Sequence, residues 1–252
     1  MASTIVLITG ANRGIGKGIL ELYLKKPNHF VIAANRDPSH PTSNALADLP
    51  KAEGTTLEII KIDALSPSDP AAAAKALAAN GITHIDILVA NAGIALSWPK
   101  VSDVKKHINV NVYGFIHLYQ AFRSLLKQAQ APKWVTIGSS SAFLTTRVRT
   151  SVLTIRRNFL PMQNAAYAPS KAVQHWYTKA ISVEDPWLTA FPVDPGWVQT
   201  DLGNRGADAF GFDNAAVTVE DSATGVVKVI DASTLQTHSG KPFNFHENEE
   251  PW

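Results

Sequence analysis

Residues 5–16 read IVLITGANRGIG, an apolar run that leads directly into three closely spaced glycines. Ile5–Ile8 has the length and branched side chains of a buried strand, and the residues after Gly16 have helical spacing. Glycines between a strand and a helix allow a tight turn and a close approach of the backbone to a pyrophosphate, which the helix N-terminus then binds. An ordinary tight turn could contain the same glycines, but this context predicts a nucleotide-binding turn. The residues expected to bind are Gly10, Asn12, Arg13, Gly14, Ile15 and Gly16.

Outward from this turn, short runs rich in valine and isoleucine alternate with stretches of helical spacing. That alternation is typical of βαβ units in an α/β protein, and seven strands fit one doubly wound, mainly parallel sheet in a single domain over residues 1–252. The expected strands are Ile5–Ile8, Phe30–Ala34, Leu57–Lys61, Ile85–Ala90, Trp134–Ile137, Thr189–Val193 and, more weakly, Pro242–Phe245. The expected helices are Ile15–Lys26, Pro70–Asn80, Val101–Gln130, Ala166–Val183 and Val219–Ala232.

Two segments do not fit this alternation. Residues 142–164 carry four arginines among apolar residues without a clean period, and residues 201–217, with three glycines, are expected to form a mobile loop.

The end of the second expected strand bears on which dinucleotide binds. An acid about 20 residues beyond the glycines would hold the ribose 2′-hydroxyl of NAD. The chain has Asn35-Arg36 there, and Asp37 comes one residue late. An arginine fork can pair with a 2′-phosphate, and Arg13 could flank the same group, so NADP(H) is the expected cofactor. Both arginines could also be ordinary surface charges.

Composition excludes several classes of protein. The 252 residues carry a net charge of +2, with 45% apolar and 17% charged residues, which is typical of a globular chain and does not favour nucleic-acid binding. Cysteine is absent, so disulfides and thiolate chemistry are excluded, and the histidine spacings indicate no metal site. The run Ile5–Ile8 is too short for a signal peptide or a membrane span, so we expect a cytoplasmic protein.

A tyrosine and a lysine four residues apart could support proton transfer. Tyr167 and Lys171 would share one face of a helix, where an ammonium group favours the phenolate and lowers the tyrosine pKa from its usual ~10 towards neutrality. Because Pro169 is tolerated only in the first turn, the helix is expected to start just before Tyr167, with Asn164 as a candidate cap.

An ordered set of motifs runs through the chain: TGANRGIG at 9–16, Asp63, Asn91-Ala92-Gly93, Asn111, Ser139, Tyr167 with Lys171, and Pro195-Gly196 before Thr200. Together they resemble the short-chain dehydrogenase/reductase family, whose members have a Rossmann fold. The stretch from Tyr167 onward, with DPGWVQTDLG, looks like the fungal ketoreductase branch that includes norsolorinic acid ketoreductase-like proteins.

The resemblance implies a role for each matching residue. Tyr167 would be the general acid/base, Lys171 would also hold the nicotinamide ribose, Ser139 would bond the reacting carbonyl oxygen, and Asn111 would bend its helix and hold a water. Ser140 competes with Ser139, and Asn109 with Asn111. The remaining expected cofactor contacts are Asp63, Ala64, Asn91, Ala92, Gly93, Pro195, Gly196, Val198 and Thr200.

The resemblance implies an NADPH-dependent reductase of ketones or aldehydes, active as a homodimer or homotetramer through the helices over 101–130 and 166–183. Trp98, Phe143, Trp197, Phe210 and Phe212 would suit a hydrophobic or aryl carbonyl substrate, although they could equally be packing residues. The 28 residues from Ser139 to Tyr167 exceed the family's usual gap, and the excess lies in 142–164. This insertion keeps open a second reading, an NADP-binding regulatory protein without turnover. A third, a nucleotide-sugar epimerase or dehydratase, usually needs a larger C-terminal region.

Overall fold

The apolar runs form a single seven-stranded sheet in the computed structural model, which describes residues 3–96, 100–143, 166–209 and 211–252. The strands lie in the order β3-β2-β1-β4-β5-β6-β7, and each neighbouring pair is parallel. Their bounds are β1 Thr4–Thr9, β2 His29–Asn35, β3 Thr56–Lys61, β4 Ile87–Ala90, β5 Lys133–Ile137, β6 Thr189–Asp194 and β7 Phe243–Asn244. The expected doubly wound α/β fold is therefore confirmed.

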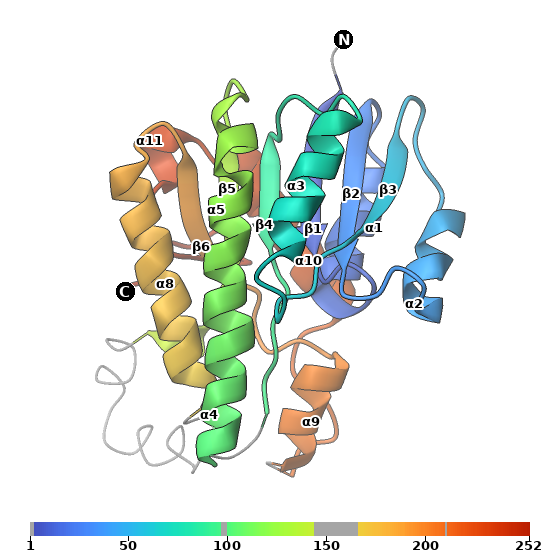
Figure 1. Ribbon diagram of the computed structural model, residues 1–252. Coiled ribbons are helices and arrows are strands. Elements are labelled where there is room, and N and C mark those ends of the chain that lie inside the picture. The colour runs from blue at the N-terminus through green and yellow to red at the C-terminus, as the bar shows by residue number, and fades with distance from the viewer. Residues whose placement is uncertain (1–2, 97–99, 144–165, 210) are drawn as a thin grey trace.

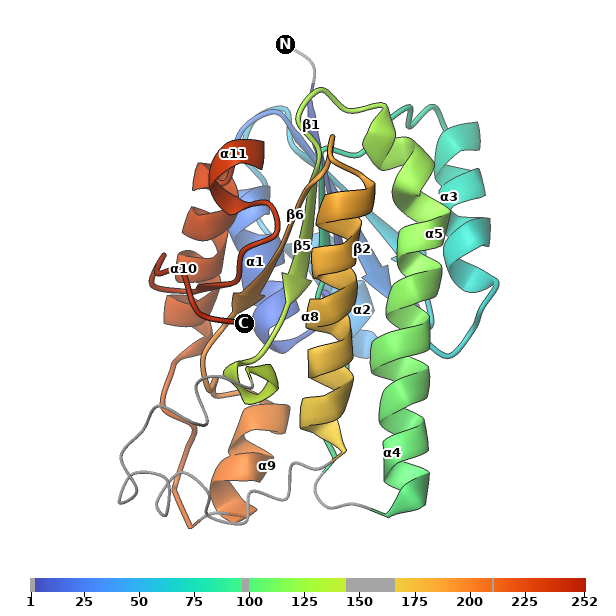
Figure 2. The same ribbon diagram turned by 90° about the vertical axis from the view of Figure 1, so that its left-hand side faces the viewer.

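Helices cover both faces of the sheet (Figures 1 and 2). One face carries α1 (Gly14–Leu24) and α10 (Val219–Ala232), and the other carries α3 (Asp69–Ala79), α5 (Gly114–Lys127) and α8 (Tyr167–Glu184). The shorter elements are α2 (Pro41–Asn44), the 3₁₀ helix η1 (Ala45–Asp48), α4 (Val101–His107), the π-helix η2 (Ile108–Tyr113), the 3₁₀ helix η3 (Ser140–Ala142), α9 (Asp201–Ala209) and α11 (Leu235–His238). In the described ranges no helix is both long and apolar enough to cross a bilayer.

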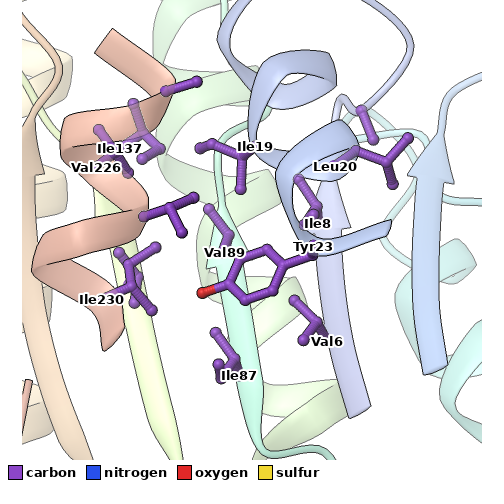
Figure 3. Close-up of a cluster of buried hydrophobic side chains, with 14 of the residues drawn as sticks. Val6, Ile8, Ile19, Leu20, Tyr23, Ile87, Val89, Ile137, Val226 and Ile230 are labelled. Atoms are coloured by element: carbon purple, nitrogen blue, oxygen red, sulfur yellow. The ribbon is translucent and has the colours of Figure 1, made fainter. Parts of the chain in front are cut away.

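The strands divide their side chains between two hydrophobic clusters because alternate residues of a strand point to opposite faces. In β1, Val6 and Ile8 join the cluster under α1 and α10, whereas Ile5 and Leu7 join the one under α3 and α5. Figure 3 shows the first cluster, in which the Tyr23 ring lies among aliphatic side chains. The Tyr23 hydroxyl bonds Asp231 on α10 at 3.4 Å, so the polar end of this buried ring is satisfied.

The helix boundaries follow local chemistry. α8 begins at Tyr167, as expected, and Pro169 occupies its first turn, where the missing N–H leaves no hydrogen bond unmade. Its N-cap residue is Ala166; the candidate cap Asn164 lies outside the described residues. α10 starts at Val219, as expected, because the Thr218 side chain accepts a hydrogen bond from the Asp221 amide at 3.0 Å.

Three expectations need correction. The segment 201–217 is not all loop: its first nine residues form α9, which packs because Gly203 and Ala207 are buried and small. The expected helix 101–130 consists of α4, the π-helix and α5, and it ends at Lys127. β4 begins two residues late, at Ile87, although the Asp86 amide already bonds the Ile5 carbonyl. Of the insertion 142–164, only residues 142 and 143 are described.

The chain winds outward from β1 through β2 to β3, then crosses to β4 on the other side of β1. In such open parallel sheets ligands bind at the carboxyl ends of the strands, where the winding reverses. That edge lies at the lower end of Figures 1 and 2, where α9 and the start of α4 extend beyond the strands. The glycine-rich turn follows β1 at this edge.

Candidate active site

The glycine-rich turn is tied to the end of the neighbouring strand β4. The Asn91 side-chain amide donates to the carbonyls of Thr9 and Gly10, at 2.8 and 3.2 Å. In return, the Thr9 hydroxyl accepts hydrogen bonds from the backbone amides of Asn91 and Ala92, both at 3.0 Å. The turn is therefore held in place by a buried strand end before any ligand binds.

Glycine is required in the turn for two reasons. Gly10 and Gly14 have φ of +64° and +53°, values that L side chains rarely adopt. Gly16 has an ordinary φ, but a Cβ there would lie 2.4 Å from the Gly10 carbonyl oxygen. A Cβ at Gly14 would lie 3.0 Å from Cγ2 of Thr200, so these positions form the cradle that a pyrophosphate needs above the N-terminus of α1. The residues therefore fit a dinucleotide.

The other turn residues have separate contacts. Ile15 packs on the cluster beneath α1 and α10. The Asn12 amide donates to the Thr42 hydroxyl on α2 at 2.6 Å, and the exposed Arg13 pairs with Asp201, at the start of α9, at 3.3 Å. Arg13 and Asn12 thus link the turn to both segments that flank it.

The end of β2 presents a cation rather than an acid. Arg36 is exposed there, whereas the Asp37 carboxylate accepts hydrogen bonds from the amide and hydroxyl of Ser39, at 2.9 and 2.6 Å. These hydrogen bonds lower the Asp37 pKa. Asn35 is 1% exposed, and neither polar atom of its side chain has a partner among the described residues. The acid at this strand end, Asp37, is thus engaged by Ser39 and follows Arg36 by one residue.

The end of β3 lies next along the same edge. The Asp63 side chain accepts a hydrogen bond from the Leu65 amide at 2.9 Å, while its own amide donates to Asp69 at 3.1 Å. Ala64 lies against the start of α5, where a Cβ on Gly114 would come within 2.6 Å of the Ala64 carbonyl oxygen.

Asn111 connects three segments from inside the π-helix. Its side-chain oxygen accepts from the Ile94 amide at 2.9 Å, and its amide donates to the Ile94 carbonyl at 2.9 Å and to the Ser170 hydroxyl at 3.0 Å. Asn111 is completely buried, whereas the competing Asn109 is exposed. A Cβ on Gly93 would lie 3.2 Å from the Asn111 side-chain oxygen and 3.8 Å from Nζ of Lys171. The wider helical turn directs this asparagine toward Gly93 and Lys171.

Ser139, Tyr167 and Lys171 come together where β5 ends beside α8. The Lys171 ammonium donates to the Ile137 carbonyl at 2.8 Å and lies 5.8 Å from the centre of the Tyr167 ring. The Ser139 hydroxyl interacts with Tyr167 and also accepts from the Ser141 amide at 3.2 Å. Ser140, in contrast, faces the Asp194 carboxylate at the end of β6. Of the two candidate serines, only Ser139 interacts with the tyrosine in these contacts.

The electrostatics differ from the expected lowering of the tyrosine pKa. Burial raises the pKa of Tyr167 to about 12; the Ser139 hydroxyl opposes this rise and the Asp194 charge adds to it. Burial also lowers the pKa of Lys171 to about 8, against the opposing effect of Asp194. The expected lowering of the tyrosine pKa is wrong because it was based only on the spacing of Tyr167 and Lys171. Burial removes water from both side chains and favours their neutral forms. In this environment Tyr167 is a neutral, protonated phenol at neutral pH.

The turn after β6 completes the edge. Gly196 has φ of +79°, the buried Pro195 carbonyl accepts from Ser222 on α10 at 2.8 Å, and Val198 is 3% exposed. The Thr200 hydroxyl accepts from the Gly203 amide at 3.1 Å at the start of α9, and its methyl group lies over Gly14. The turn therefore brings Thr200 to the glycine-rich turn.

The aromatic residues expected around a substrate are only partly placed. Phe143 is buried against the His175 ring at 5.2 Å, and Trp197 packs on Phe212 at 5.7 Å beside α9. Trp98 and Phe210 lie outside the described residues. Among the described residues, no group of three or more His, Asp or Glu could hold a metal ion.

Two residues of this region were missed in the sequence. Asp194 directly precedes the Pro195-Gly196 pair, and its position at a strand end was the available signal. His175 lies one helical turn beyond Lys171, on the helix face that carries Tyr167. It was missed because the histidines were checked only for the spacing of metal ligands.

Residues 4–152 match the family model of short chain dehydrogenases. The chain belongs to this family. Short-chain dehydrogenase relatives match almost the whole chain: a norsolorinic acid ketoreductase of Dothistroma septosporum is 38% identical over 99% of this chain and 92% of its own length. A short-chain dehydrogenase of Neurospora crassa is also 38% identical, over 99% of this chain and 98% of its own. The solved structure of an NADPH-bound carbonyl reductase from chicken fatty liver aligns over 100% of both chains, with a TM-score of 0.81 and 25% identity.

Proposed function

We propose that this short-chain dehydrogenase reduces a ketone or an aldehyde to an alcohol with NADPH. The observation that carries the proposal is the gathering of Ser139, Tyr167, Lys171 and Asn111 at the sheet edge that also carries the glycine-rich turn. The ketoreductase and carbonyl reductase names of its relatives support the same chemistry.

Each residue takes the role that the family resemblance implies, and its surroundings in the structure are compatible with that role. Tyr167, whose pKa burial raises to about 12, is a protonated phenol at neutral pH and would donate its proton to the carbonyl oxygen. The Ser139 hydroxyl donates a hydrogen bond to that oxygen and stabilises its developing charge. Lys171 would hold the nicotinamide ribose. Asn111 fixes the backbone at Ile94 and would hold a water that passes protons towards Lys171. When bound, the cofactor supplies a hydride from its nicotinamide ring.

The residues that hold NADP(H) would lie along the carboxyl edge. Gly10, Gly14, Ile15 and Gly16 would bind the pyrophosphate. Arg36 would bind the 2′-phosphate end, with Arg13 and Asn12 contributing from the glycine-rich turn. Asp63 and Ala64 would contact the adenine, and Asn91, Ala92 and Gly93 its ribose. Pro195, Gly196, Val198 and Thr200 would hold the carboxamide of the nicotinamide, with α9 and the residues after it over the substrate.

A homodimer or homotetramer fits the exposed faces of the long helices. Trp176 and Val183 on α8 are 64% and 67% exposed, and such large apolar side chains favour burial in an interface. Light scattering on the purified chain would give the mass of the assembly directly.

The direct test follows the absorbance of reduced nicotinamide, with NADPH and NADH, over a panel of aryl ketones, diketones and aldehydes. We expect oxidation of NADPH that depends on a hydrophobic carbonyl and is lost in Tyr167→Phe, whereas NADPH still binds this variant. NADPH binding without turnover on any carbonyl would instead support a regulatory protein of the same fold.

A further inference from the structure

His175 lies behind Ser139, at the junction of β5 and α8. It is 4% exposed, and its ring contacts Phe143 at 5.2 Å and Trp252 at 6.3 Å between ring centres. It follows Lys171 by one helical turn, so the same face of α8 that presents the tyrosine and the lysine also presents this imidazole.

The imidazole contacts the backbone that carries the serine. His175 Nε2 lies 3.3 Å from the Ser139 amide and accepts its hydrogen bond. A Cβ on Gly138 would come within 2.3 Å of the same nitrogen, so the ring rests directly on the backbone at the end of β5. A side chain at Gly138 would displace the ring, so the position of the His175 imidazole depends on a glycine at residue 138.

The charge state suits an acceptor. Burial, with a smaller effect of Lys171, lowers the pKa of His175 to about 3, so the ring is neutral at neutral pH. Because Nε2 accepts, the proton must lie on Nδ1, which has no hydrogen-bond partner among the described residues. A buried N–H without a partner is costly, and such exceptions in a folded protein call for an explanation.

We propose that His175 is a positioning residue that holds the backbone of Ser139 so that the serine hydroxyl faces Tyr167. This inference rests on the proposed reductase function and extends it to a group that does not touch the substrate. The Ser139 hydroxyl already interacts with Tyr167 on one side and with the Ser141 amide on the other. The imidazole adds a third constraint, on the amide of the serine itself.

Two variants of similar length separate positioning from packing. His175→Gln keeps an acceptor close to the position of Nε2, and His175→Met fills the same space without one. We expect His175→Met to lower kcat about 10- to 100-fold, the cost of misplacing a reacting group, with the Kd for NADPH unchanged. His175→Gln should recover most of that loss. Equal losses in both variants, with equal losses of stability, would overturn the proposal.

A double-mutant cycle tests the route of the effect. In a Ser139→Ala background, His175→Met should cause no further fall in kcat, because the group it positions is gone. A full additional loss would show that His175 acts elsewhere. The ¹⁵N spectrum of the unmodified, histidine-labelled protein should show a neutral ring protonated on Nδ1, and protonation on Nε2 would contradict the hydrogen bond. This measurement needs no turnover, so it tests the inference even if the reductase function fails.

Discussion

The side-chain amide of Asn111 donates a hydrogen bond to the Ser170 hydroxyl at 3.0 Å, and so joins the π-helical turn to the helix that carries Tyr167 and Lys171. The same side chain closes two hydrogen bonds with the backbone of Ile94. One buried asparagine therefore sets the separation between the segment after β4 and α8.

Replacing this asparagine should cost both stability and activity. Asn111→Leu keeps the approximate volume but leaves the Ile94 amide and carbonyl without partners, so we expect a loss of about 1–3 kcal/mol of unfolding free energy for each group left buried and unpaired. Urea unfolding measures the loss. Asn109→Leu, in the same π-helical turn but exposed, should change stability by no more than about 0.5 kcal/mol. Similar losses in the two variants would contradict the role of the buried contacts.

The cofactor preference should depend on Arg36. Arg36→Asp removes the cation and adds a repelling charge at the end of β2, so we expect NADPH binding to weaken about 10- to 100-fold, the equivalent of one or two charge-assisted hydrogen bonds. NADH binding should be unchanged or tighter. Titration calorimetry with both cofactors gives the ratio, and Lys75→Asp on α3 is a control of equal charge change. An unchanged ratio of the two dissociation constants would refute the assignment to Arg36.

The pH profile should respond to Asp194. Its negative charge raises the pKa values of both Tyr167 and Lys171, so Asp194→Asn should lower both. Because reduction needs the protonated tyrosine, the alkaline fall in kcat should move to lower pH. The negative charge of Glu250 in turn raises the pKa of Asp194. Asp208→Asn, on the exposed side of α9, should leave the profile where it is, and a shift of the Asp194→Asn profile to higher pH would contradict the sign.

A stability prediction comes from a cluster between α5 and the end of α8. Asp185 is 3% exposed and accepts hydrogen bonds from Tyr119 and from Arg123, the latter at 2.7 and 2.5 Å. Burial would raise its pKa, but these hydrogen bonds and the arginine charge outweigh burial and hold the pKa below its usual value.

A carboxyl group with a lowered folded pKa stabilises the protein above its unfolded pKa, near ~3.9, and loses that contribution as the pH falls through the folded value. Asp185→Asn should therefore lower the unfolding free energy by about 1.5–3 kcal/mol at neutral pH and by progressively less in acid. Unfolding curves at pH 7 and below pH 4 give the comparison, with the exposed Asp48→Asn as control. A deficit that stays constant across that range would show that the charge is not the cause.

The glycine-rich turn yields a steric prediction. In Gly16→Ala the new methyl group would meet the Gly10 carbonyl oxygen at 2.4 Å and the Asn91 side-chain amide at 2.5 Å, and the hydrogen bond between these two groups leaves little room to relax. We expect a loss of about 1–3 kcal/mol, as in overpacked cores, together with the loss of NADPH binding. Gly206→Ala, in the middle of α9 with its nearest neighbour at 3.6 Å, should instead stabilise the chain by about 0.5–1 kcal/mol. Equal thermal shifts for the two variants would overturn the steric argument.

The sequence predicted the sheet well because most of its strands are short apolar runs. The residues around Pro169 and Thr218 mark helix starts by their local chemistry. α9 escaped prediction because its glycines signal a loop, yet Gly203 is needed against the Val198 carbonyl, a contact that only the folded chain creates. The local sequence pattern of α9 cannot show a packing contact that forms only when the chain folds.

The site was predicted in outline and not in its electrostatics. Spacing placed Tyr167 and Lys171 on one helical face, and the structure does so as well. Their pKa values depend on burial and on Asp194 at the end of another strand, and neither follows from the spacing of two residues. His175 was missed for a related reason, since its contact with the Ser139 amide joins residues 36 positions apart.

The bonds from Asn91 to the glycine-rich turn have an evolutionary consequence. These bonds join β1 to β4 at the centre of the sheet, and a side chain at Gly16 would collide with both bonded groups. The selection that keeps the chain foldable therefore also keeps Gly16 and Asn91 in place. A descendant that lost the proposed reductase activity would be free to change first at Arg36, which is exposed and lies just beyond the end of β2. Among distant homologues, an intact glycine-rich turn would then indicate only that the chain folds. Exposed positions such as Arg36 would indicate whether the activity has been kept.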